Sequence, residues 1–206
     1  MNSFKIILPI IALTTLLGCK DISQLFDTEQ SSASELSEIS KELEDLDRVI
    51  SWAQANYNHH PNINSSNITL LGHSRGGGIV TLKAFEDPRV KKVVSLAGVS
   101  DFKSRFPMEY ELEKWEETGV RFILNGRTKQ QMPHYYQFYK DFMANEARLT
   151  IKTAAQQLKL PFLIIHGDAD TSVSIDEALA LHKWSTKSQL IVLEGANHFF
   201  GSCHPW

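Results

Sequence analysis

The sequence lacks an excess of charge of either sign, and it lacks a long hydrophobic run. Its 206 residues carry a formal net charge of -3 with a pI near 6.2. Without a basic patch the chain is not expected to bind nucleic acid, and we expect its partners to be small molecules. Hydrophobic residues make up 42% and charged residues 22% of the chain, which fits one globular domain with a sizeable core.

The longest apolar stretch predicts a signal peptide rather than a membrane-spanning helix. Lys5 precedes an apolar run at 6–17, which is too short to span a bilayer as a stable helix. The run ends in Leu16-Leu17-Gly18-Cys19, which resembles the bacterial lipobox, in which the cysteine becomes the lipidated first residue. We therefore expect a lipoprotein-type signal peptide at 1–18 and a tether at 19–33. The alternative is an uncleaved apolar strand or helix.

Cysteine is scarce, with two residues in the whole chain. If Cys19 carries a lipid anchor, Cys203 is left without a partner, and no intramolecular disulfide is expected. This interpretation places the protein in the bacterial cell envelope, held to the membrane through Cys19 on the periplasmic or surface side.

The domain expected at 34–206 begins with an amphipathic helix. Apolar residues recur at alternating steps of three and four: Leu36, Ile39, Leu43, Leu46, Ile50 and Ala53. The stripe is shorter than three heptads, so packing against a sheet is favoured over a coiled coil, although a homodimer through this helix is a further hypothesis.

Residues 67–85 carry the most specific motif of the chain. An apolar run breaks at Gly72, and a helical pattern resumes at Ile79, which predicts a strand, a sharp turn and a helix with Ser74 at the apex. Gly72 and Gly76 are expected because side chains there would clash in so tight a turn. The backbone N–H of Arg75, at the start of the helix, is the candidate oxyanion-hole donor.

The rest of the chain predicts further parallel strands and one insertion. Apolar runs at 90–99, 161–165 and 189–193 predict buried strands, and a helix is expected at 176–184. The segment 102–160 is rich in aromatic residues and predicts a cap-like insertion, mostly helical. Within it, 120–124 followed by Asn125-Gly126 predicts a hairpin with a two-residue type I′ turn.

Three residues at the ends of these strands provide the chemistry that an exposed serine needs. Carboxyl ends of parallel strands meet at one edge of a sheet, so the loops that carry Ser74, Asp170 and His198 can converge. A serine nucleophile requires a base and a carboxylate that orients the base, and these residues follow in the order serine, acid, histidine.

Alternatives for these roles stay open at this point. Asp168 and Asp101 are the other candidate acids. His73 lies inside the elbow, His166 precedes the acid loop, and His204 is close to the C-terminus, so each is a weaker candidate for the base. No cluster of residues has metal-ligand spacing, so neither a metal nor a cofactor is expected.

The three motifs resemble those of the α/β-hydrolase superfamily, and most closely its dienelactone hydrolase and prolyl-oligopeptidase-like group. They are Gly72-His73-Ser74-Arg75-Gly76, His166-Gly167-x-x-Asp170-x-x-Val173 and Gly195-Ala196-x-His198. The resemblance implies an α/β fold with about four parallel strands and flanking helices. It also implies that Ser74 is the nucleophile, His198 the base and then the acid, and Asp170 the orienting carboxylate, with a small ester or peptide as substrate.

The chain departs from that family pattern at both ends. The family has four strands before the elbow, and the loop after the third supplies a second oxyanion donor, yet no glycine occurs between Cys19 and Leu71 to form such a loop. The elbow strand is then expected at an open edge of a reduced fold. We expect a serine hydrolase that cleaves carboxylic esters through an acyl-enzyme. A peptidase and a truncated remnant acting as a binding module are the alternatives.

Overall fold

The computed structural model describes residues 38–124 and 129–202. The signal peptide, the tether, Cys19, Leu36, Asn125-Gly126, Cys203 and His204 lie outside these residues, so the expectations about them stay predictions. In the part described, no helix is both long and apolar enough to cross a membrane.

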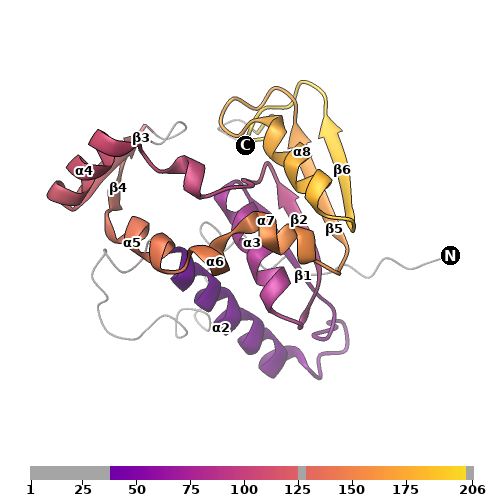
Figure 1. The fold of residues 1–206 in the computed structure, drawn as a ribbon. Helices are drawn as coiled ribbons and strands as arrows, with labels where there is room; N and C mark the ends of the chain where they lie inside the picture. The colour runs from indigo at the N-terminus through magenta and orange to yellow at the C-terminus, as the bar shows by residue number, and fades with distance from the viewer. Residues whose placement is uncertain (1–37, 125–128, 203–206) are drawn as a thin grey trace.

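Four parallel strands form the central sheet, which confirms the expected fold class. They are β1 (Ile68–His73), β2 (Val90–Leu96), β5 (Phe162–Gly167) and β6 (Ser188–Leu193), in the order β1-β2-β5-β6. The elbow strand β1 is an edge strand among the described residues, as the sequence led us to expect. Because all strands are parallel, their carboxyl ends share one edge (Figure 1).

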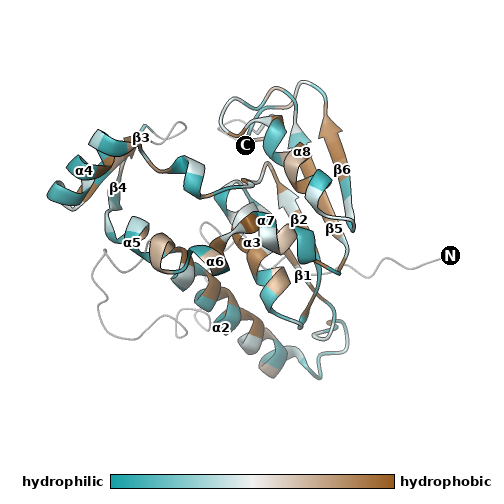
Figure 2. Cartoon of the chain, in the orientation of Figure 1, coloured by the Kyte–Doolittle hydropathy of each residue, from teal (hydrophilic) through white to brown (hydrophobic). Residues whose placement is uncertain are grey.

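One face of this sheet is much better covered than the other. Residues such as Leu70 and Ile164 are fully buried, because α3 (Arg75–Glu86) and α8 (Ile175–Trp184) pack on their side, with α7 (Ile151–Gln157) against both helices. On the other face, Ile191 of β6 is 45% exposed. Figure 2 shows hydrophobic residues in the upper part of β6.

The first helix, α2 (Ile39–Tyr57), buries the apolar stripe that its sequence predicts. Ile39, Leu43 and Ile50 are fully buried in the same core cluster as the sheet. Its direct partners, however, are α3 and α5 (Gln137–Ala144) rather than the sheet, because α3 already covers the strands at this position. With this stripe occupied inside the chain, the homodimer stays a prediction and would need another surface.

The segment between β2 and β5 forms a lobe, whose middle part projects at the left of Figure 1. It contains the 3-10 turn η2 (Lys103–Arg105), α4 (Glu109–Thr118), β3 (Val120–Leu124), β4 (Gln131–Tyr135), α5 and α6 (Glu146–Leu149), and it ends with α7. Most of its aromatic rings are core, as expected: Phe106 packs on Trp115, Phe138 and Phe142 with ring centroids 5.1 to 6.4 Å apart. Tyr110 is an exception at 74% exposure.

The predicted hairpin exists in this lobe, and its connection is longer than a two-residue turn. Strands β3 and β4 are antiparallel and pair Leu124 with Gln131, so six positions separate the paired strand ends. No bounds were predicted for the second strand, which contains Pro133, a residue that interrupts a β pattern. A two-stranded sheet tolerates it, since both strands are edges.

Candidate active site

Ser74 lies between β1 and α3 in a backbone conformation that non-glycine residues rarely adopt. Its φ is 58° and its ψ is -124°. Three hydrogen bonds hold it there: its N–H donates to the Leu96 carbonyl at 2.9 Å, and its own carbonyl accepts from Gly77 and Val99 at 2.9 and 3.2 Å. The strained turn is thus fixed by β2 and by the start of α3.

Of the two glycines that were expected to be sterically required in the elbow, the structure requires one. A Cβ on Gly72 would lie 2.1 Å from the carbonyl oxygen of Gly76, which confirms the clash predicted there. A Cβ on Gly76 would meet nothing within 4 Å, so the steric reason predicted for this glycine is wrong. The crowded position is Gly77, where a Cβ would lie 2.5 Å from Ser95 Oγ and 2.7 Å from Gly98 Cα. Close packing of α3 on β2 therefore requires Gly77.

The loops after β1, β5 and β6 bring Ser74, Asp170 and His198 together. His198 Nε2 lies 3.0 Å from Ser74 Oγ, and His198 Nδ1 lies 2.7 Å from Asp170 Oδ2. Because the carboxylate can only accept, Nδ1 carries a proton, and Nε2 is then free to accept the proton of the serine hydroxyl. The three side chains are thus joined by two hydrogen bonds that share the imidazole of His198.

Asp170 is buried and held in its ionised form by its surroundings. Burial by itself raises the pKa of this carboxyl, but N–H donors from Val173 and Ser172 at 2.9 and 2.8 Å, together with His198, outweigh burial and lower the pKa below its usual value. The acid is therefore available to orient the imidazole at any pH near neutrality.

The other candidate acids occupy structural positions. Asp168 accepts the backbone N–H of Gly195 at 2.7 Å, which ties the acid loop to the histidine loop. Asp101 accepts the N–H groups of Lys103 and Ser104 and caps the turn η2. Of the three carboxylates, Asp170 is the one that faces His198.

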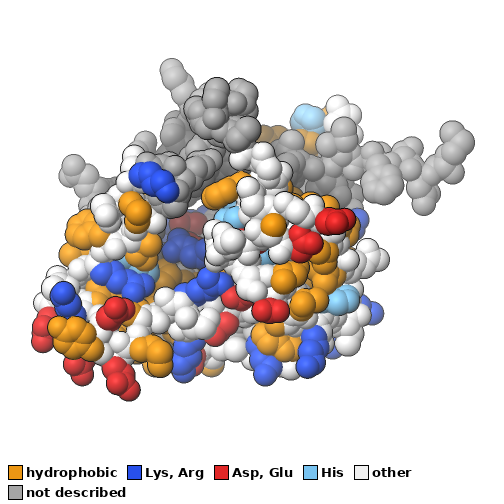
Figure 3. All heavy atoms as spheres, turned by 90° about the horizontal axis from the view of Figure 1, so that it is seen from above, with side chains coloured by type: hydrophobic (Ala, Val, Ile, Leu, Met, Phe, Trp, Pro, Cys, Tyr) orange, Lys and Arg blue, Asp and Glu red, His pale blue; other side chains and the backbone are white. Residues whose placement is uncertain are grey.

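His166 and His73 both lie next to these residues. His166 is fully buried; its Nε2–H donates to the Val173 carbonyl at 2.9 Å and lies 3.4 Å from Asp170 Oδ2, so it supports the acid loop as expected. His73 donates to the backbone of His198, a contact that no sequence pattern indicated. Figure 3 views the molecule from above and shows histidine and basic side chains among hydrophobic ones on this surface.

Arg75 is the first residue of α3. Its backbone N–H therefore has no acceptor within the helix. Its guanidinium pairs with Glu42 of α2 and lies 5.4 Å from the ring centroid of Phe138. Burial raises the pKa of Glu42, whereas Arg75 acts in the opposite direction. In the described chain no strand precedes β1, so a second donor loop of the family type is not found there.

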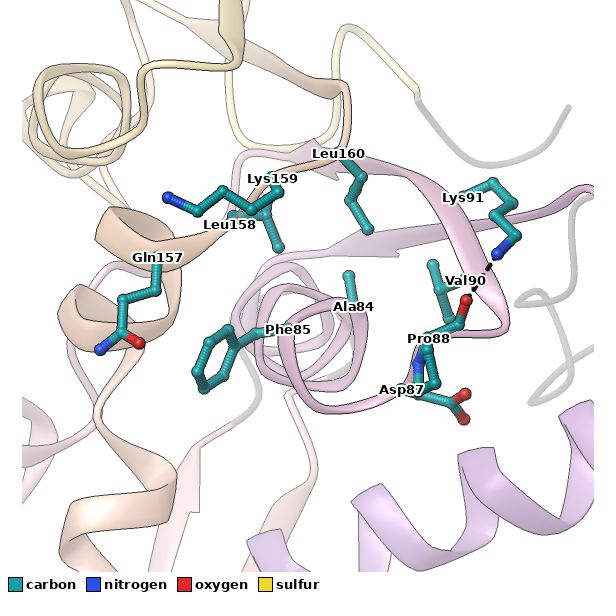
Figure 4. A pocket seen from close by; sticks show the side chains of 10 residues that line it. All are labelled: Ala84, Phe85, Asp87, Pro88, Val90, Lys91, Gln157, Leu158, Lys159 and Leu160. Carbon is teal, nitrogen blue, oxygen red and sulfur yellow. Dashed lines mark hydrogen bonds between the residues drawn. The ribbon is translucent and has the colours of Figure 1, made fainter.

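The described residues offer no metal-ion site, and a groove that they form lies away from Ser74. No group of three or more His, Cys, Asp or Glu side chains in the described residues is placed to hold a metal ion. A groove of about 440 Å³ lies at the far end of α3, between Pro88, Lys91 and Leu160 (Figure 4). This groove is at the amino ends of β2 and β5, opposite to Ser74.

Part of the chain is similar in sequence to a bacterial protein that is named as a peptidase. The chain is 28% identical over 125 residues to the "Uncharacterized peptidase YtmA" of Bacillus subtilis (strain 168), covering 60% of this chain and 43% of that protein. It therefore spans less than half the length of this relative.

Solved structures show the same fold at low sequence identity. A putative hydrolase from Agrobacterium vitis S4 has a TM-score of 0.64 at 20% identity, over 82% of this chain and 64% of that one. Est1E from Butyrivibrio proteoclasticus has a TM-score of 0.58 at 17% identity, over 80% of this chain and 64% of that one. Residues 39–204 match the prolyl oligopeptidase family. The chain thus belongs to the prolyl oligopeptidase family of the α/β-hydrolase superfamily.

Proposed function

We propose that this chain hydrolyses carboxylic esters through an acyl-enzyme on Ser74. The observation that carries the proposal is the pair of contacts at 3.0 and 2.7 Å that links Ser74, His198 and Asp170. A serine hydroxyl is a weak nucleophile on its own, and a hydrogen-bonded imidazole that is oriented by a carboxylate makes it reactive.

Each residue has a defined part in this reaction. His198 Nε2 takes the hydroxyl proton as Ser74 Oγ bonds to the substrate carbonyl, and the oxygen that becomes negative accepts the N–H of Arg75. When the ester bond breaks, the alcohol leaves with the proton from His198. Water then gives a proton to His198 and attacks the acyl group, which releases the acid and restores Ser74. Asp170 stays ionised and stabilises the imidazolium in both steps.

Two features favour an ester as the substrate: its leaving group and the single hydrogen-bond donor identified for the oxyanion in the described part of the chain. An alkoxide leaves more easily than an amine, so an ester demands less stabilisation from the single donor identified at Arg75. The esterase domain of a Rhodothermus marinus protein, which is among the structural neighbours, supports this choice. Peptide hydrolysis is the second candidate, favoured by the family match and by the peptidase name of the Bacillus relative.

The test is covalent labelling of the full chain with a fluorophosphonate, combined with turnover of a short p-nitrophenyl ester and of a chromogenic peptide amide. Ser66→Ala is the control, because this serine is exposed and lies just before β1. The wild type and this control should both react with the fluorophosphonate and cleave the ester. Ser74→Ala should do neither.

The outcomes separate the three candidates. Labelling with faster ester turnover supports the proposal, and labelling with faster amide turnover supports the peptidase. Absence of labelling that depends on Ser74 would leave the binding-module hypothesis.

A further inference from the structure

His73, the last residue of β1, touches both the backbone and the ring of His198. Its Nε2–H donates a hydrogen bond of 2.8 Å to the carbonyl oxygen of His198. The two imidazole rings lie against each other, with centroids 4.7 Å apart and planes tilted by 47°. One side chain of the elbow strand is thus in direct contact with the residue proposed as the base.

The loop that carries His198 has few other attachments at this point. At its start it is bonded to Asp168 and Ala169 of the neighbouring loop, at 2.7 and 3.1 Å. Further along, the side-chain oxygen of Asn197 accepts two N–H groups of the same loop, so these bonds do not attach it to anything else. Within the described residues, the backbone at 197–202 is hydrogen-bonded to the rest of the chain through His73 alone.

The charge of His73 also suits this position. Burial lowers the pKa of its imidazole below the usual value, although the hydrogen bond to the His198 carbonyl acts in the opposite direction. During the proposed reaction His198 becomes an imidazolium, and a second cation with its ring centroid 4.7 Å away would oppose that charge. A neutral imidazole donates the same hydrogen bond without this repulsion.

We propose that His73 is a positioning residue, whose Nε2–H fixes the backbone of His198 so that the imidazole stays within reach of the Ser74 hydroxyl. The inference rests on the proposed function, because a base needs this accuracy only if it acts on Ser74. His73 does not touch the reacting atoms and acts through His198.

Three substitutions at this position separate the hydrogen bond from ring packing. In His73→Gln the side-chain amide nitrogen reaches about as far as Nε2 and keeps the donor, whereas in His73→Asn it stops at the reach of Nδ1. His73→Phe keeps a ring and loses the donor. We expect the Asn and Phe variants to lower kcat for the p-nitrophenyl ester about tenfold with KM within about twofold, and the Gln variant to recover most of the loss.

The measurement normalises each rate to the number of sites that react with fluorophosphonate, so misfolded protein does not count. The proposal is overturned if the Phe variant matches the wild type, or if the Gln variant loses as much kcat as the Phe variant. A change confined to KM would also contradict it.

A second readout does not depend on turnover. The proton on His198 Nδ1 that bonds to Asp170 should give a downfield imidazole resonance in a proton NMR spectrum of the wild type and the Gln variant, and this resonance should broaden or vanish in the Phe variant. An unchanged resonance in the Phe variant overturns the positioning role. If the wild type shows neither ester turnover nor labelling, the proposed function is wrong. The resonance still tests whether His73 holds His198 in place.

Discussion

The loops at the carboxyl edge of the sheet and the lobe between β2 and β5 are held together by different forces. In the loops, directional polar bonds fix single atoms, as where Asp170 meets two N–H groups and the His198 ring. In the lobe, the rings of Phe138, Tyr139 and Phe142 pack around Phe106 and mainly fill volume. Removing one polar atom should therefore impair the reaction, whereas removing one ring should impair the stability of the fold.

The largest effect is expected for Asp170→Asn. The amide has nearly the same shape but favours the wrong imidazole tautomer, so kcat for the p-nitrophenyl ester should fall about 10⁴-fold. The matched variant Asp168→Asn keeps a side-chain oxygen that can accept the N–H of Gly195, loses only the charge, and should lower kcat about tenfold or less. A similar loss in both variants would mean that the carboxylates share the role and would weaken the assignment of Asp170.

In the lobe, Phe142→Ala should act on stability instead. Phe142 is 2% exposed, and truncating such a ring lowers the free energy of unfolding by about 3–5 kcal/mol. Urea denaturation measures this change, and the ester rate per folded molecule should stay near that of the wild type. Tyr110→Ala is the control, expected within about 0.5 kcal/mol because this ring is 74% exposed. A strong loss of rate with unchanged stability in Phe142→Ala would break the comparison.

Two neighbouring glycines of the elbow should respond in opposite directions. Gly77→Ala should lower the free energy of unfolding by about 1–3 kcal/mol, since its methyl group would meet Ser95 and Gly98. Gly76→Ala has open space and should be neutral, or stabilise the helix by about 0.5–1 kcal/mol. Equal destabilisation in urea by both variants would show that α3 does not pack on β2 as described.

The smallest expected effect is a difference in acid sensitivity between the two regions. Burial, together with the charges of Arg121 and Arg75, lowers the pKa of His134 in the lobe to about 4. The unfolded chain binds a proton at this histidine near pH 6.5 and the folded chain does not, so stability should fall as the pH drops from 6.5 towards 4. In His134→Gln, the decrease in the free energy of unfolding over this pH range should be smaller by about 1 kcal/mol than in the wild type, after allowance for partial exposure of His134 to solvent.

Asp170 should titrate in a lower window. Its pKa is lowered in the folded state, so its contribution to stability is present above the unfolded value of 3.8 and is lost as the pH falls through the folded value. Urea midpoints measured across both windows would test this order. If the urea midpoint of His134→Gln decreases with pH as much as that of the wild type, His134 is not the cause of the acid sensitivity.

The polar loops were also the part that the sequence predicted best. Each of the three residues Ser74, Asp170 and His198 follows a strand. Because the strands are parallel, the three residues come to lie at the same edge of the sheet. Helix α2 was recognised from its apolar stripe, whose buried members match the expected period.

What escaped prediction depends on contacts between distant parts of the chain. The role of Gly77 arises from Ser95 and Gly98 on the next strand and its following loop, and the role of His73 arises from a carbonyl 125 positions away. The strand β4 carries Pro133, and its register with β3 was not visible from a local turn pattern. No short window of sequence contains both partners of such contacts.

The sequence separation within the site has a consequence for how the protein acquires activity as it folds. Ser74 and His198 are 124 positions apart and lie on loops after β1 and β6, the outer strands of the sheet in the described part of the chain. Their contact closes a very long loop, and contacts of this kind form late because the chain must lose much of its freedom first. A protein emerging from the ribosome, or refolding from urea, should regain its tryptophan fluorescence before it regains reactivity towards fluorophosphonate. Reactivity of Ser74 would then report the completion of the whole sheet rather than the formation of the elbow.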